Sequence, residues 1–580
     1  MNTDKTIRRF VLAGFFAGAV LGQSPGPRFE MADVHVSPAS AQPNMRGGFY
    51  RGGRYEIRSA SMVDLIRTAY SVDADDKVSG GPAWLEKDRF DVIAKAPADS
   101  TADSLKLMLQ GLLAERFSLA VHNDTRPLPG YALRVGKKVQ MKAGDGSGES
   151  GCKLQPQDTP QAGGGRLMIN MNGVSLTLGT GSYIVYSCRN VSMASFGDQL
   201  RSMIFAGAYL TTNRVVDETE LKGTFSFDFK YSPKLPAMIM AGGDGNTDVV
   251  TLFDAVDKQL GLRLEATKIP LPVIAVDSVN ERPTENAPGV TEKLPVAPTE
   301  FEVADIKPSD PNFRPGPGNF VPVFQPGGRV NLRNDTMADL IGLAWNLNGN
   351  TNGRIIGLPK SLETAHWDIV AKAPTSASLN APPNGQPVAQ NVDYDSMRVM
   401  VQALLKDRFG LVLHTEDRPL PGYALLAVKP KMKAADPANR PGCKEGPGAD
   451  GKDPRTANPA ASRLVTCLNM TMADFAAQIS QQANGYFVQF PGGVVDETKL
   501  EGAYDITLSF SAAGIVMGGG GGRGGDGGSV NGGAGQALDP SGAISLQDAL
   551  EKQQGLKLQP QKNPAAVLVV DHVAEKPSDN

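Results

Sequence analysis

Apolar residues recur at helical spacing at corresponding places in the two halves of the chain. In the first half the apolar positions i, i+3, i+4, i+7 and i+8 are Leu105, Met108, Leu109, Leu112 and Leu113. In the second half the same positions are Met397, Met400, Val401, Leu404 and Leu405. This spacing is typical of a helix that packs one face against a core. We therefore predict one long amphipathic helix in each half.

Shorter helices are predicted where a Ser or Thr is followed three residues later by Asp. These pairs are Ser61/Asp64, Thr251/Asp254, Thr336/Asp339, Thr471/Asp474 and Ser545/Asp548. The hydroxyl can accept a hydrogen bond from a free amide of the first turn, and the carboxylate lies at the positive end of the helix dipole. We interpret these aspartates as caps rather than catalysts. Gly261 and Gly555 stand where a left-handed residue would end the last helix of each half.

Long segments of the chain occur twice. Residues 112–133 and 404–425 are identical at 14 of 22 positions, and VVDETELKG at 215–223 returns as VVDETKLEG at 494–502. The repeat predicts two homologous tandem domains, residues 23–280 and 301–580. A chain of 580 residues exceeds the size at which one core stops growing, which agrees with two domains.

A fainter duplication lies inside each domain. TMADL at 336–340 returns as TMADF at 471–475, and the residues from 362 parallel those from 500. Each time the predicted order is strand, short helix, strand, longer helix and two-stranded hairpin. The predicted fold class is α+β, with mixed or antiparallel sheets, packed helices and an internal pseudo-duplication in each domain.

Two segments have the composition of connections. Residues 281–300 contain four prolines and predict an extended linker between the copies. Residues 514–535 contain GGGGGRGGDGG and predict a flexible surface insertion. A phosphate-binding loop is the alternative, but the GK[ST] ending of such loops is missing.

Residues 1–22 resemble a signal peptide. Three basic residues precede a 12-residue apolar run at 10–21, and Gly22 offers a small residue for cleavage before Gln23. As a helix this run would span about 18 Å, less than the roughly 30 Å hydrocarbon core. We expect an exported protein, periplasmic or secreted, with no stable membrane span after signal removal. An uncleaved anchor is the alternative.

Composition narrows the classes of partner. The 58 basic and 61 acidic residues leave a net charge of −3, which gives no electrostatic reason to expect nucleic acid. The sequence contains no catalytic signature: no H-E-x-x-H for zinc, no G-x-S-x-G and no cofactor fingerprint. We therefore expect no cofactor and no metal.

The four cysteines allow three pairings. Each copy holds two of them at matching places, so the duplication favours Cys152–Cys188 and Cys443–Cys467. Disulfides suit an exported protein. Metal binding is the alternative, and the absence of a C-x-x-C pair argues against it.

The most suggestive polar group is a histidine, an arginine and a tyrosine at fixed spacing in each copy. The predicted ligand-binding residues are His122, Arg126, Tyr131, His414, Arg418 and Tyr423. They could bind an anion or assist proton transfer. The structural alternative is a hairpin in which 126–129 form the turn and the tyrosine covers the edge of the core.

Two other groups are interpreted as structural. The adjacent acids of VVDET, Asp217/Glu218 and Asp496/Glu497, face opposite sides of an extended segment and favour a turn or Asx-type cap. Trp84 and Trp367 favour core packing over a groove for sugars or peptides.

Several segments resemble a known family. They are FEMADVHVSP, SMVDLIRTAYSV, VSGGPAWLEKDRFDVIAKAP, MLQGLLAERFSLAVHNDTRPLPGYAL, VVDETELKGTFSFDF and LGLRLEATKIPLPVIAVDSVNERPTEN. They resemble the soil-associated family of exported proteins with a domain of unknown function, which is expanded in acidobacterial genomes. The resemblance implies no established activity and brings no catalytic residues. Some relatives carry the domain after a membrane metallopeptidase similar to a β-lactam sensor, which implies envelope sensing or binding; this chain lacks that membrane part.

A second likeness is local. Residues 545–550 followed by 555–558 are similar to the small βαβ modules of secretins and TonB-dependent receptors, which associate through sheet edges and helix faces.

Together these observations predict a non-catalytic binding or protein-interaction module of the cell envelope or secreted space. Two tethered copies would raise avidity for a ligand or partner. The partner would be an unknown envelope or extracellular ligand or protein. The alternatives are an uncharacterised enzyme that uses the repeated His/Arg/Tyr group, and a structural envelope protein.

Overall fold

The structure is a computed structural model that describes most of residues 26–578. The residues outside the description in this range are 39–43, 52, 73–76, 156–166, 172–173, 179–182, 211–213, 234–249, 311–322, 326–327, 348–350, 352, 375–376, 379–393, 438, 447–460, 462, 514–515 and 517–542. The predicted signal peptide lies outside the described residues, as does the predicted glycine-rich insertion except for Val516.

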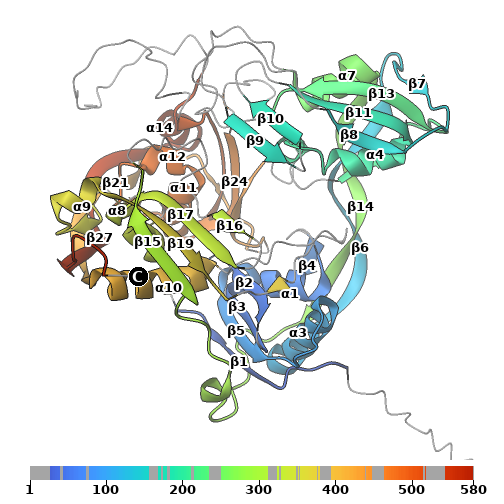
Figure 1. Cartoon of the computed structure of the whole chain (residues 1–580). Coiled ribbons are helices and arrows are strands. Elements are labelled where there is room, and N and C mark those ends of the chain that lie inside the picture. Colours follow the sequence, from blue (N-terminus) through green and yellow to red (C-terminus); the bar gives the residue numbers. More distant parts are fainter. Residues whose placement is uncertain are drawn as a thin grey trace, which may run out of the picture.

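Four lobes built to one plan make up the chain (Figure 1). Each lobe holds a four-stranded antiparallel sheet, and the four sheets are β1-β5-β3-β2, β7-β13-β11-β8, β15-β19-β17-β16 and β22-β26-β24-β23. In every one of these sheets, the strand that comes first along the chain lies at an edge. The strand that comes last lies next to it, followed by the third and then the second. Both the tandem duplication and the inner duplication are thus confirmed by strand order.

Lobes 1 and 2 form the first copy. Lobe 1 contains β1 (Met31–Val36), β2 (Arg46–Arg51), β3 (Arg54–Ser61), α1 (Met62–Tyr70), β4 (Val78–Gly80), α2 (Trp84–Lys87), β5 (Arg89–Lys95) and α3 (Ala102–Phe117). The chain then enters β6 (Ala120–Val135). Lobe 2 contains β7 (Lys142–Ala143), β8 (Gly151–Leu154), β9 (Leu167–Met171), β10 (Val174–Leu178), β11 (Ile184–Val191), α4 (Met193–Leu200), α5 (Gly207–Leu210), β12 (Arg214–Asp217), β13 (Phe225–Tyr231), α7 (Leu252–Leu260) and β14 (Leu262–Ser278).

Lobes 3 and 4 form the second copy, after a 3-10 turn η2 (Thr291–Lys293). Lobe 3 contains β15 (Val303–Pro308), β16 (Val323–Gln325), β17 (Arg329–Thr336), α8 (Met337–Ala344), β18 (Ile355–Ile356), α9 (Lys360–Thr364), β19 (His366–Lys372), β20 (Ala377–Ser378) and α10 (Tyr394–Phe409). The chain then enters β21 (Val412–Ala427). Lobe 4 contains β22 (Lys433–Ala434), β23 (Gly442–Glu445), β24 (Arg463–Thr471), α11 (Met472–Gln482), α12 (Asn484–Phe487), β25 (Val494–Asp496), β26 (Ala503–Phe510), α14 (Leu546–Ala549), η4 (Leu550–Gln554, a π turn) and β27 (Leu556–His572).

The predicted helix starts and stops are confirmed. The five predicted Ser/Thr caps each accept a hydrogen bond from the backbone N–H of the Asp three residues on, and they are Ser61, Thr251, Thr336, Thr471 and Ser545. Gly261 and Gly555 end their helices in the left-handed conformation, with φ of 71° and 69°. The predicted apolar stripes of α3 and α10 face their cores, where Leu109 and Leu405 are fully buried.

A shared backbone feature places each lobe's first helix. Just before the helix cap, the strand bulges at a residue with positive φ, at Ser59, Asn190, Asn334 and Asn469. In each lobe the N–H of that residue donates to a side chain on the neighbouring strand, at Asp91, Ser226, Asp368 and Asp505. The bulge bends the strand so that the following helix packs across the sheet.

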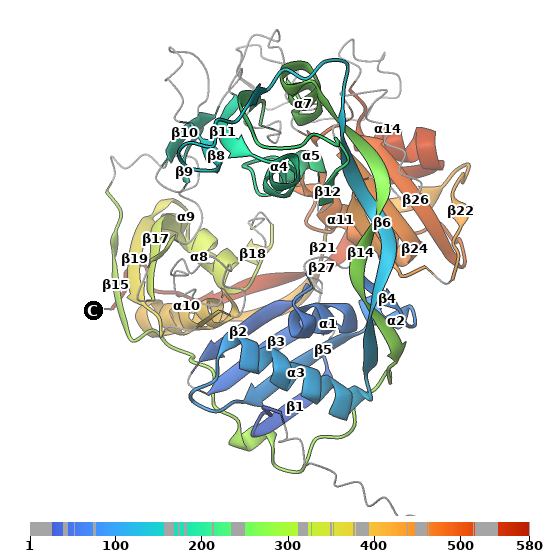
Figure 2. The same ribbon diagram turned by 90° about the vertical axis from the view of Figure 1, so that its right-hand side faces the viewer.

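A long two-stranded ribbon joins the lobes of each copy. β6 pairs antiparallel with β14 from Ala120↔Ser278 to Val135↔Leu262, and β21 pairs in the same way with β27. In Figure 2 the β6–β14 ribbon runs upright from lobe 1 to lobe 2. Short parallel strands extend it: β4 pairs with the lobe-1 end of β14, and β12 pairs with the lobe-2 end of β6. Each ribbon strand therefore leaves one lobe and completes the other.

The hairpin turn predicted at residues 126–129 is wrong, because these residues lie in the middle of β6. Pro127 stands opposite Pro270, and Pro129 stands opposite Lys268. In an antiparallel pair, alternate residues direct their N–H groups away from the partner strand. Prolines at those positions cost no ladder hydrogen bond, so the ribbon tolerates them.

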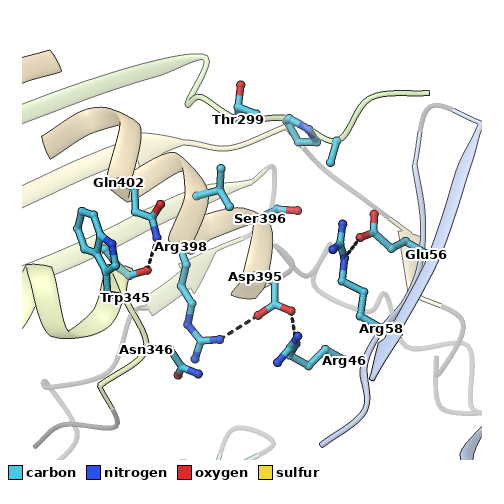
Figure 3. A pocket seen from close by; sticks show the side chains of 14 residues that line it. Arg46, Glu56, Arg58, Thr299, Trp345, Asn346, Asp395, Ser396, Arg398 and Gln402 are labelled. Atoms are coloured by element: carbon cyan, nitrogen blue, oxygen red, sulfur yellow. Dashed lines mark hydrogen bonds and ion pairs between the residues drawn. The ribbon is translucent and has the colours of Figure 1, made fainter. Parts of the chain in front are cut away.

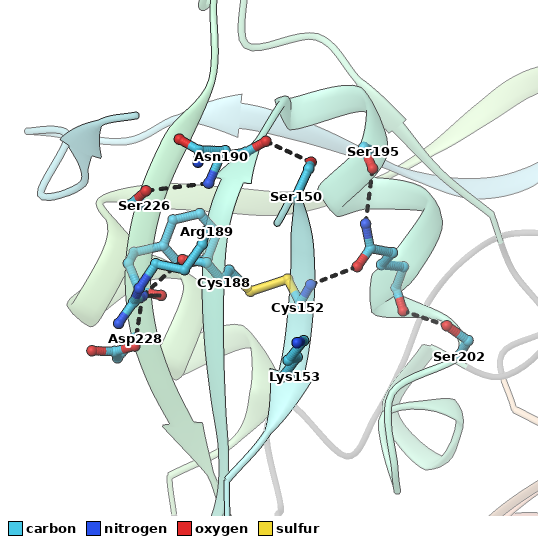
Figure 4. The surroundings of a disulfide bond; sticks show 12 residues. Ser150, Cys152, Lys153, Cys188, Arg189, Asn190, Ser195, Ser202, Ser226 and Asp228 are labelled. Atoms are coloured by element: carbon cyan, nitrogen blue, oxygen red, sulfur yellow. Dashed lines mark hydrogen bonds and ion pairs between the residues drawn. A yellow bond between two sulfur atoms is a disulfide. The ribbon is translucent and has the colours of Figure 1, made fainter. Parts of the chain in front are cut away.

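The two predicted disulfides are confirmed. Cys152 bonds to Cys188 and Cys443 bonds to Cys467, each joining two neighbouring strands at directly opposite positions. Figure 4 shows Cys152 on β8, where its N–H donates to Gln199 Oε1 at 3.0 Å. The bridges tie the outermost strands β8 and β23 to lobes 2 and 4.

Each lobe has its own hydrophobic core, and the ribbons contribute to these cores. Ile274 and Val276 of β14 complete the core of lobe 1, and Leu568 and Val570 of β27 complete that of lobe 3. Trp84 packs against the core of lobe 1, and Trp367 is 5% exposed in lobe 3, as core packing predicts. Among the described helices, none has the length and apolarity needed to cross a bilayer.

Lobe 1 contacts both lobes of the second copy. β20 of lobe 3 adds to the edge of the lobe-1 sheet by pairing antiparallel with β2. Arg440 of lobe 4 donates to the carbonyl oxygens of Val78 and Gly80, at 2.7 and 2.5 Å. The two copies are therefore in direct contact through a strand pair and side-chain hydrogen bonds.

The segment between the copies is held against lobe 1. Arg116, 6% exposed, donates to Thr284 Oγ1 at 2.9 Å and to Asn286 Oδ1 at 2.7 Å. Asn286 donates in turn to Asp33. Burial acts to raise the pKa of Asp33, but hydrogen bonds from His35, Thr291 and Asn286 outweigh it and lower that pKa. Residues 281–300 are thus docked by side chains while having little regular structure.

Candidate functional site

The predicted ligand-binding histidines lie on the ribbons, near lobes 1 and 3. His122 Nδ1 is 2.8 Å from Asp277 Oδ1, and His414 Nδ1 is 2.9 Å from Asp571 Oδ2. All four side chains are about half exposed, at 56% and 49% in the first pair and 52% and 43% in the second. Each histidine thus has a carboxylate neighbour on the partner strand, at the surface.

The predicted arginines and tyrosines do not converge on these histidines. Arg126 pairs with Asp124 at 3.0 Å and Arg418 pairs with Glu416, both in exposed positions on the same strand. Tyr131 packs beside Phe253 of α7, with ring centroids 5.5 Å apart. Tyr423, 9% exposed, belongs to the core of lobe 4, and burial raises its pKa.

A continuous strand explains this separation. Tyr131 lies nine positions after His122 along the strand, which is about 30 Å at 3.3 Å per residue. Their odd spacing also sends the two side chains to opposite faces. The structure therefore brings together each histidine and an aspartate, but not the predicted triad. Ligand binding at the six residues stays a prediction.

The acids of VVDET form the predicted Asx-type turns. Asp217 Oδ1 accepts from the N–H of Thr219 at 2.9 Å, and Asp496 Oδ1 accepts from the N–H of Thr498 at 2.8 Å. Glu218 instead points to Arg134, 2.8 Å away. The adjacent acids are thus used for different structural contacts.

A pocket of about 460 Å³ lies where the two copies and the linker meet. Lobe 1 contributes Arg46, Glu56 and Arg58, and the linker contributes residues 297–299. Lobe 3 contributes residues 344–346 at the end of α8, and α10 contributes Asp395, Ser396, Arg398, Val399 and Gln402. Figure 3 shows charged side chains from both copies turned toward one another across this junction.

Guanidinium groups are the dominant feature of the pocket. Asp395 binds Arg46 of the other copy at 2.5 Å and Arg398 of its own helix at 2.9 Å. Glu56 binds Arg58 and, at 2.6 Å, Arg54. Arg54 also donates to the carbonyl of Pro295 in the linker. These ion pairs orient the arginines and join lobe 1, the linker and lobe 3.

The net charge of the side chains that line the pocket is positive. Three arginines and two carboxylates line it, which leaves one positive charge: 3 − 2 = +1. Burial acts to lower the pKa of Arg58, but the carboxylates of Glu56, Asp91 and Asp395 outweigh it and raise that pKa. The side chain of Arg58 remains 40% exposed and so can reach a ligand.

Neutral groups form the lobe-3 side of the pocket. Trp345 ends α8 and stands beside Asn346 (Figure 3). Gln402 of α10 is held in place by a hydrogen bond to the carbonyl of Ala344, at 2.8 Å. The described lining has no histidine or cysteine. It offers an aromatic ring, amides and cations beside the two carboxylates.

Lobe 1 carries the counterpart of the lobe-3 side of the pocket. Gln110 of α3 donates to the carbonyl of Ala69 at 2.8 Å, as Gln402 donates to that of Ala344. Tyr70 stands at the place of Trp345. Lys106 and Asp103 are 3.6 Å apart, at the places of Arg398 and Asp395. Asp103 is 92% exposed, whereas Asp395 is 26% exposed beneath lobe 1.

The sequence interpretation missed this pocket. Its arginines belong to no motif that the sequence pattern identifies. Arg46 and Arg58 flank a glycine-rich segment, and Arg398 lies between apolar positions of α10. The available signal was the difference between the copies: at aligned positions, Tyr70 and Lys106 became Trp345 and Arg398. Only the contact between the copies shows that these residues share a site.

The described residues contain no group of three or more His, Cys, Asp or Glu side chains placed to hold a metal ion.

Comparison with protein families gives two matches. The model described as a protein of unknown function (DUF3738) matches residues 63–279 and again residues 338–573. The comparison with curated proteins found no significant match, and neither did that with solved structures. The expected association with soil bacteria stays a prediction. Because the two matches together span most of the chain, the protein belongs to the DUF3738 family and carries its domain twice.

Proposed function

We propose that the protein is an exported, non-catalytic binding protein, and that the pocket between its copies binds a small organic anion. The arginines supplied by both copies at one pocket carry this proposal. The predicted signal peptide and the two disulfides support export, since disulfides persist in oxidising compartments. Pockets at domain junctions are also common ligand sites.

The chemistry of the lining favours a carboxylate attached to a ring. Arginine meets carboxylates with paired N–H donors in one plane. Arg58 and Arg398 are each held by one acidic neighbour, so their planes are oriented before a ligand arrives. Trp345 offers an aromatic face on which a sugar ring or similar group can pack, with Asn346 beside it for hydrogen bonding. An acidic saccharide combines these features.

The test is a thermal-shift measurement on residues 23–580 with matched probes. The probes are digalacturonate, a neutral disaccharide of the same size and an acidic tripeptide. A ligand at a hundred times its Kd stabilises the native state by about 2.7 kcal/mol. We expect digalacturonate to raise the Tm, the neutral disaccharide to have little effect, and added salt to weaken the response.

Paired variants locate the response. Arg58→Ala with Trp345→Ala should abolish it, because both lie in the pocket. Tyr70→Ala with Lys106→Ala should retain it, because these aligned residues do not line the pocket. If no acidic probe raises the Tm, or if both pairs respond as the wild type does, the pocket is not the binding site. A response to the tripeptide alone would assign the site to peptides.

A further inference from the structure

We propose that the protein assembles head to tail, with lobe 3 of one molecule docking on lobe 1 of the next. The contact would repeat between molecules the contact that lobe 1 makes with lobe 3 inside one molecule. This inference does not depend on the proposed ligand.

The internal contact has two complementary faces. One is the receiving face, made by the first turns of α10 and the end of α8, where Asp395 accepts Arg46. The other is the docking face, made by β2 and β3 of lobe 1, which presents Arg46 and Arg58. Lobes 1 and 3 share one fold, so each has both faces. Inside the molecule, only the docking face of lobe 1 and the receiving face of lobe 3 are in contact.

The receiving face of lobe 1 remains open. It lies on α3, where Asp103 is 92% exposed and Leu107 is 50% exposed. Asp103 aligns with Asp395 and Leu107 aligns with Val399, which lines the internal contact. Leu107 is 50% and Val399 41% exposed, so the two faces differ chiefly at Asp103, which is 92% exposed, and Asp395, which is 26% exposed. An occupied face in one copy thus has an unoccupied counterpart in the other.

The docking face of lobe 3 has the complementary charge. Its strand β17 presents Arg333 and Arg329, both exposed, at the places of Arg58 and Arg54. Asn331 replaces Glu56, so the acid that holds the arginines in lobe 1 is missing in lobe 3. Strand β17 is therefore more basic than β3 and suits Asp103 of a second molecule, while β16 (Val323–Gln325) carries no arginine to match Arg46 of β2.

The geometry implies open-ended growth. A contact between two different faces is heterologous, and it produces rings or filaments rather than a closed two-fold dimer. The contact would lack the strand pairing of β20 with β2, since lobe 1 joins β5 to α3 through residues 96–101 without a matching strand. We therefore expect association that is weak, concentration-dependent and reduced by salt.

Substitutions at one residue of each face test the two faces separately, in residues 23–580 studied by sedimentation velocity over a wide concentration range. Asp103→Arg removes the receiving face, and Arg333→Ala removes the docking face without creating a new partner for the arginine that Asp103→Arg introduces. Both residues are exposed, so folding is preserved. We expect the wild type to assemble and each variant alone to stay monomeric. An equimolar mixture should form a dimer that grows no further, because each partner supplies the one face that the other lacks.

Glu149→Arg is the matched control, because Glu149 is 78% exposed on lobe 2. It should assemble as the wild type does. A wild type that stays monomeric at every concentration would overturn the proposal, and so would variants that assemble normally. If both variants are monomeric but their mixture forms no dimer, the contact is not head to tail. Retained assembly in Trp345→Ala would separate this contact from the ligand pocket.

Discussion

Asp335 occupies a position that is apolar in the other three lobes. It follows the bulge residue of β17, where the other lobes have Ala60, Val191 and Met470, all buried. Burial, together with Asp339 and Asp368 nearby, raises the pKa of Asp335 to about 7. A carboxyl thus stands at a position that the fold otherwise uses for packing.

Replacing Asp335 should stabilise the protein at high pH. The pKa of the folded state lies above the unfolded value, so this group's stabilising contribution is present at low pH and is lost as the pH rises toward 7. We expect Asp335→Ala to raise the free energy of unfolding by about 1–3 kcal/mol at pH 8, and by much less near pH 4.5. Urea unfolding at the two pH values measures this. Asp103→Ala, at an exposed site, is the control, and a variant less stable than wild type at pH 8 would contradict the expectation.

Asp91 is the residue on which the lobe-1 bulge depends. It is 5% exposed and accepts from the N–H of Ser59 at 2.8 Å and from Ser37 Oγ at 2.5 Å. Asp91→Ala leaves a buried N–H without its acceptor, which we expect to cost about 2–3 kcal/mol. Ser37→Ala, which removes only the second bond, should cost about 1 kcal/mol. Chemical denaturation compares them, and equal losses would show that the bulge does not need the carboxylate.

At the scale of elements, the residue pairs of the ribbon alternate between pairs with and pairs without ladder hydrogen bonds. Pro127 and Pro270 face each other, and neither can donate, so their pair is one without ladder hydrogen bonds. The neighbouring pair, Leu128 and Ile269, must then carry them. Thr125 lies two residues before Pro127, so its pair with Pro272 is also one without ladder hydrogen bonds.

Proline scanning of β6 should follow this alternation. Leu128→Pro removes a ladder bond and leaves the facing carbonyl without its donor, which should destabilise by about 1–3 kcal/mol. Thr125→Pro should cost less than about 1 kcal/mol, because its N–H faces away from β14 and donates only to the exposed Asp124, at 2.7 Å. Leu128→Ala separates the loss of side-chain contacts from the loss of the bond. Thermal unfolding of the three variants is the measurement, and a similar loss for both prolines would reject the assigned register.

What could be predicted from sequence depended on the range of the interaction. Ser61 with Asp64, and Gly261 after α7, act within a few residues, so the pattern alone identified them. The segment around Pro127 was misread because its meaning depends on a partner strand about 140 residues later. Arg46 and Asp395 meet through the contact between the copies, which no local pattern records.

At the scale of the whole molecule, Arg440 fastens lobe 4 to lobe 1. Its side chain is 16% exposed, and its two donors satisfy the carbonyls of Val78 and Gly80 beside Glu86. Together with β20, it determines how the copies lie relative to each other and hence the shape of the pocket.

Removing this arginine should loosen the copies without unfolding them. We expect Arg440→Ala to increase the radius of gyration in small-angle scattering, since two backbone carbonyls lose their donors. Arg189→Ala on lobe 2, where the side chain is 50% exposed, should leave the radius unchanged. An unchanged radius for Arg440→Ala would mean that the contacts between lobes 1 and 3, the pairing of β20 with β2 and the Arg46–Asp395 ion pair, are enough to hold the copies.

Because each ribbon strand completes the core of a lobe other than the one it leaves, the ribbon also determines the order in which the cores can form during synthesis. Lobe 1 is almost finished when α3 has been made, but its core waits for Ile274 and Val276. Lobe 2, by contrast, takes Leu133 from β6 and Leu262 from the start of β14, and both are made before Ile274. As the chain emerges, the second lobe can close first, and the first lobe stays open until the copy is nearly complete. The same order repeats in the second copy, where Leu568 and Val570 arrive near the end of the chain. A chain cut short near its C-terminus would therefore damage lobe 3, more than 150 residues upstream of the cut, before the neighbouring lobe.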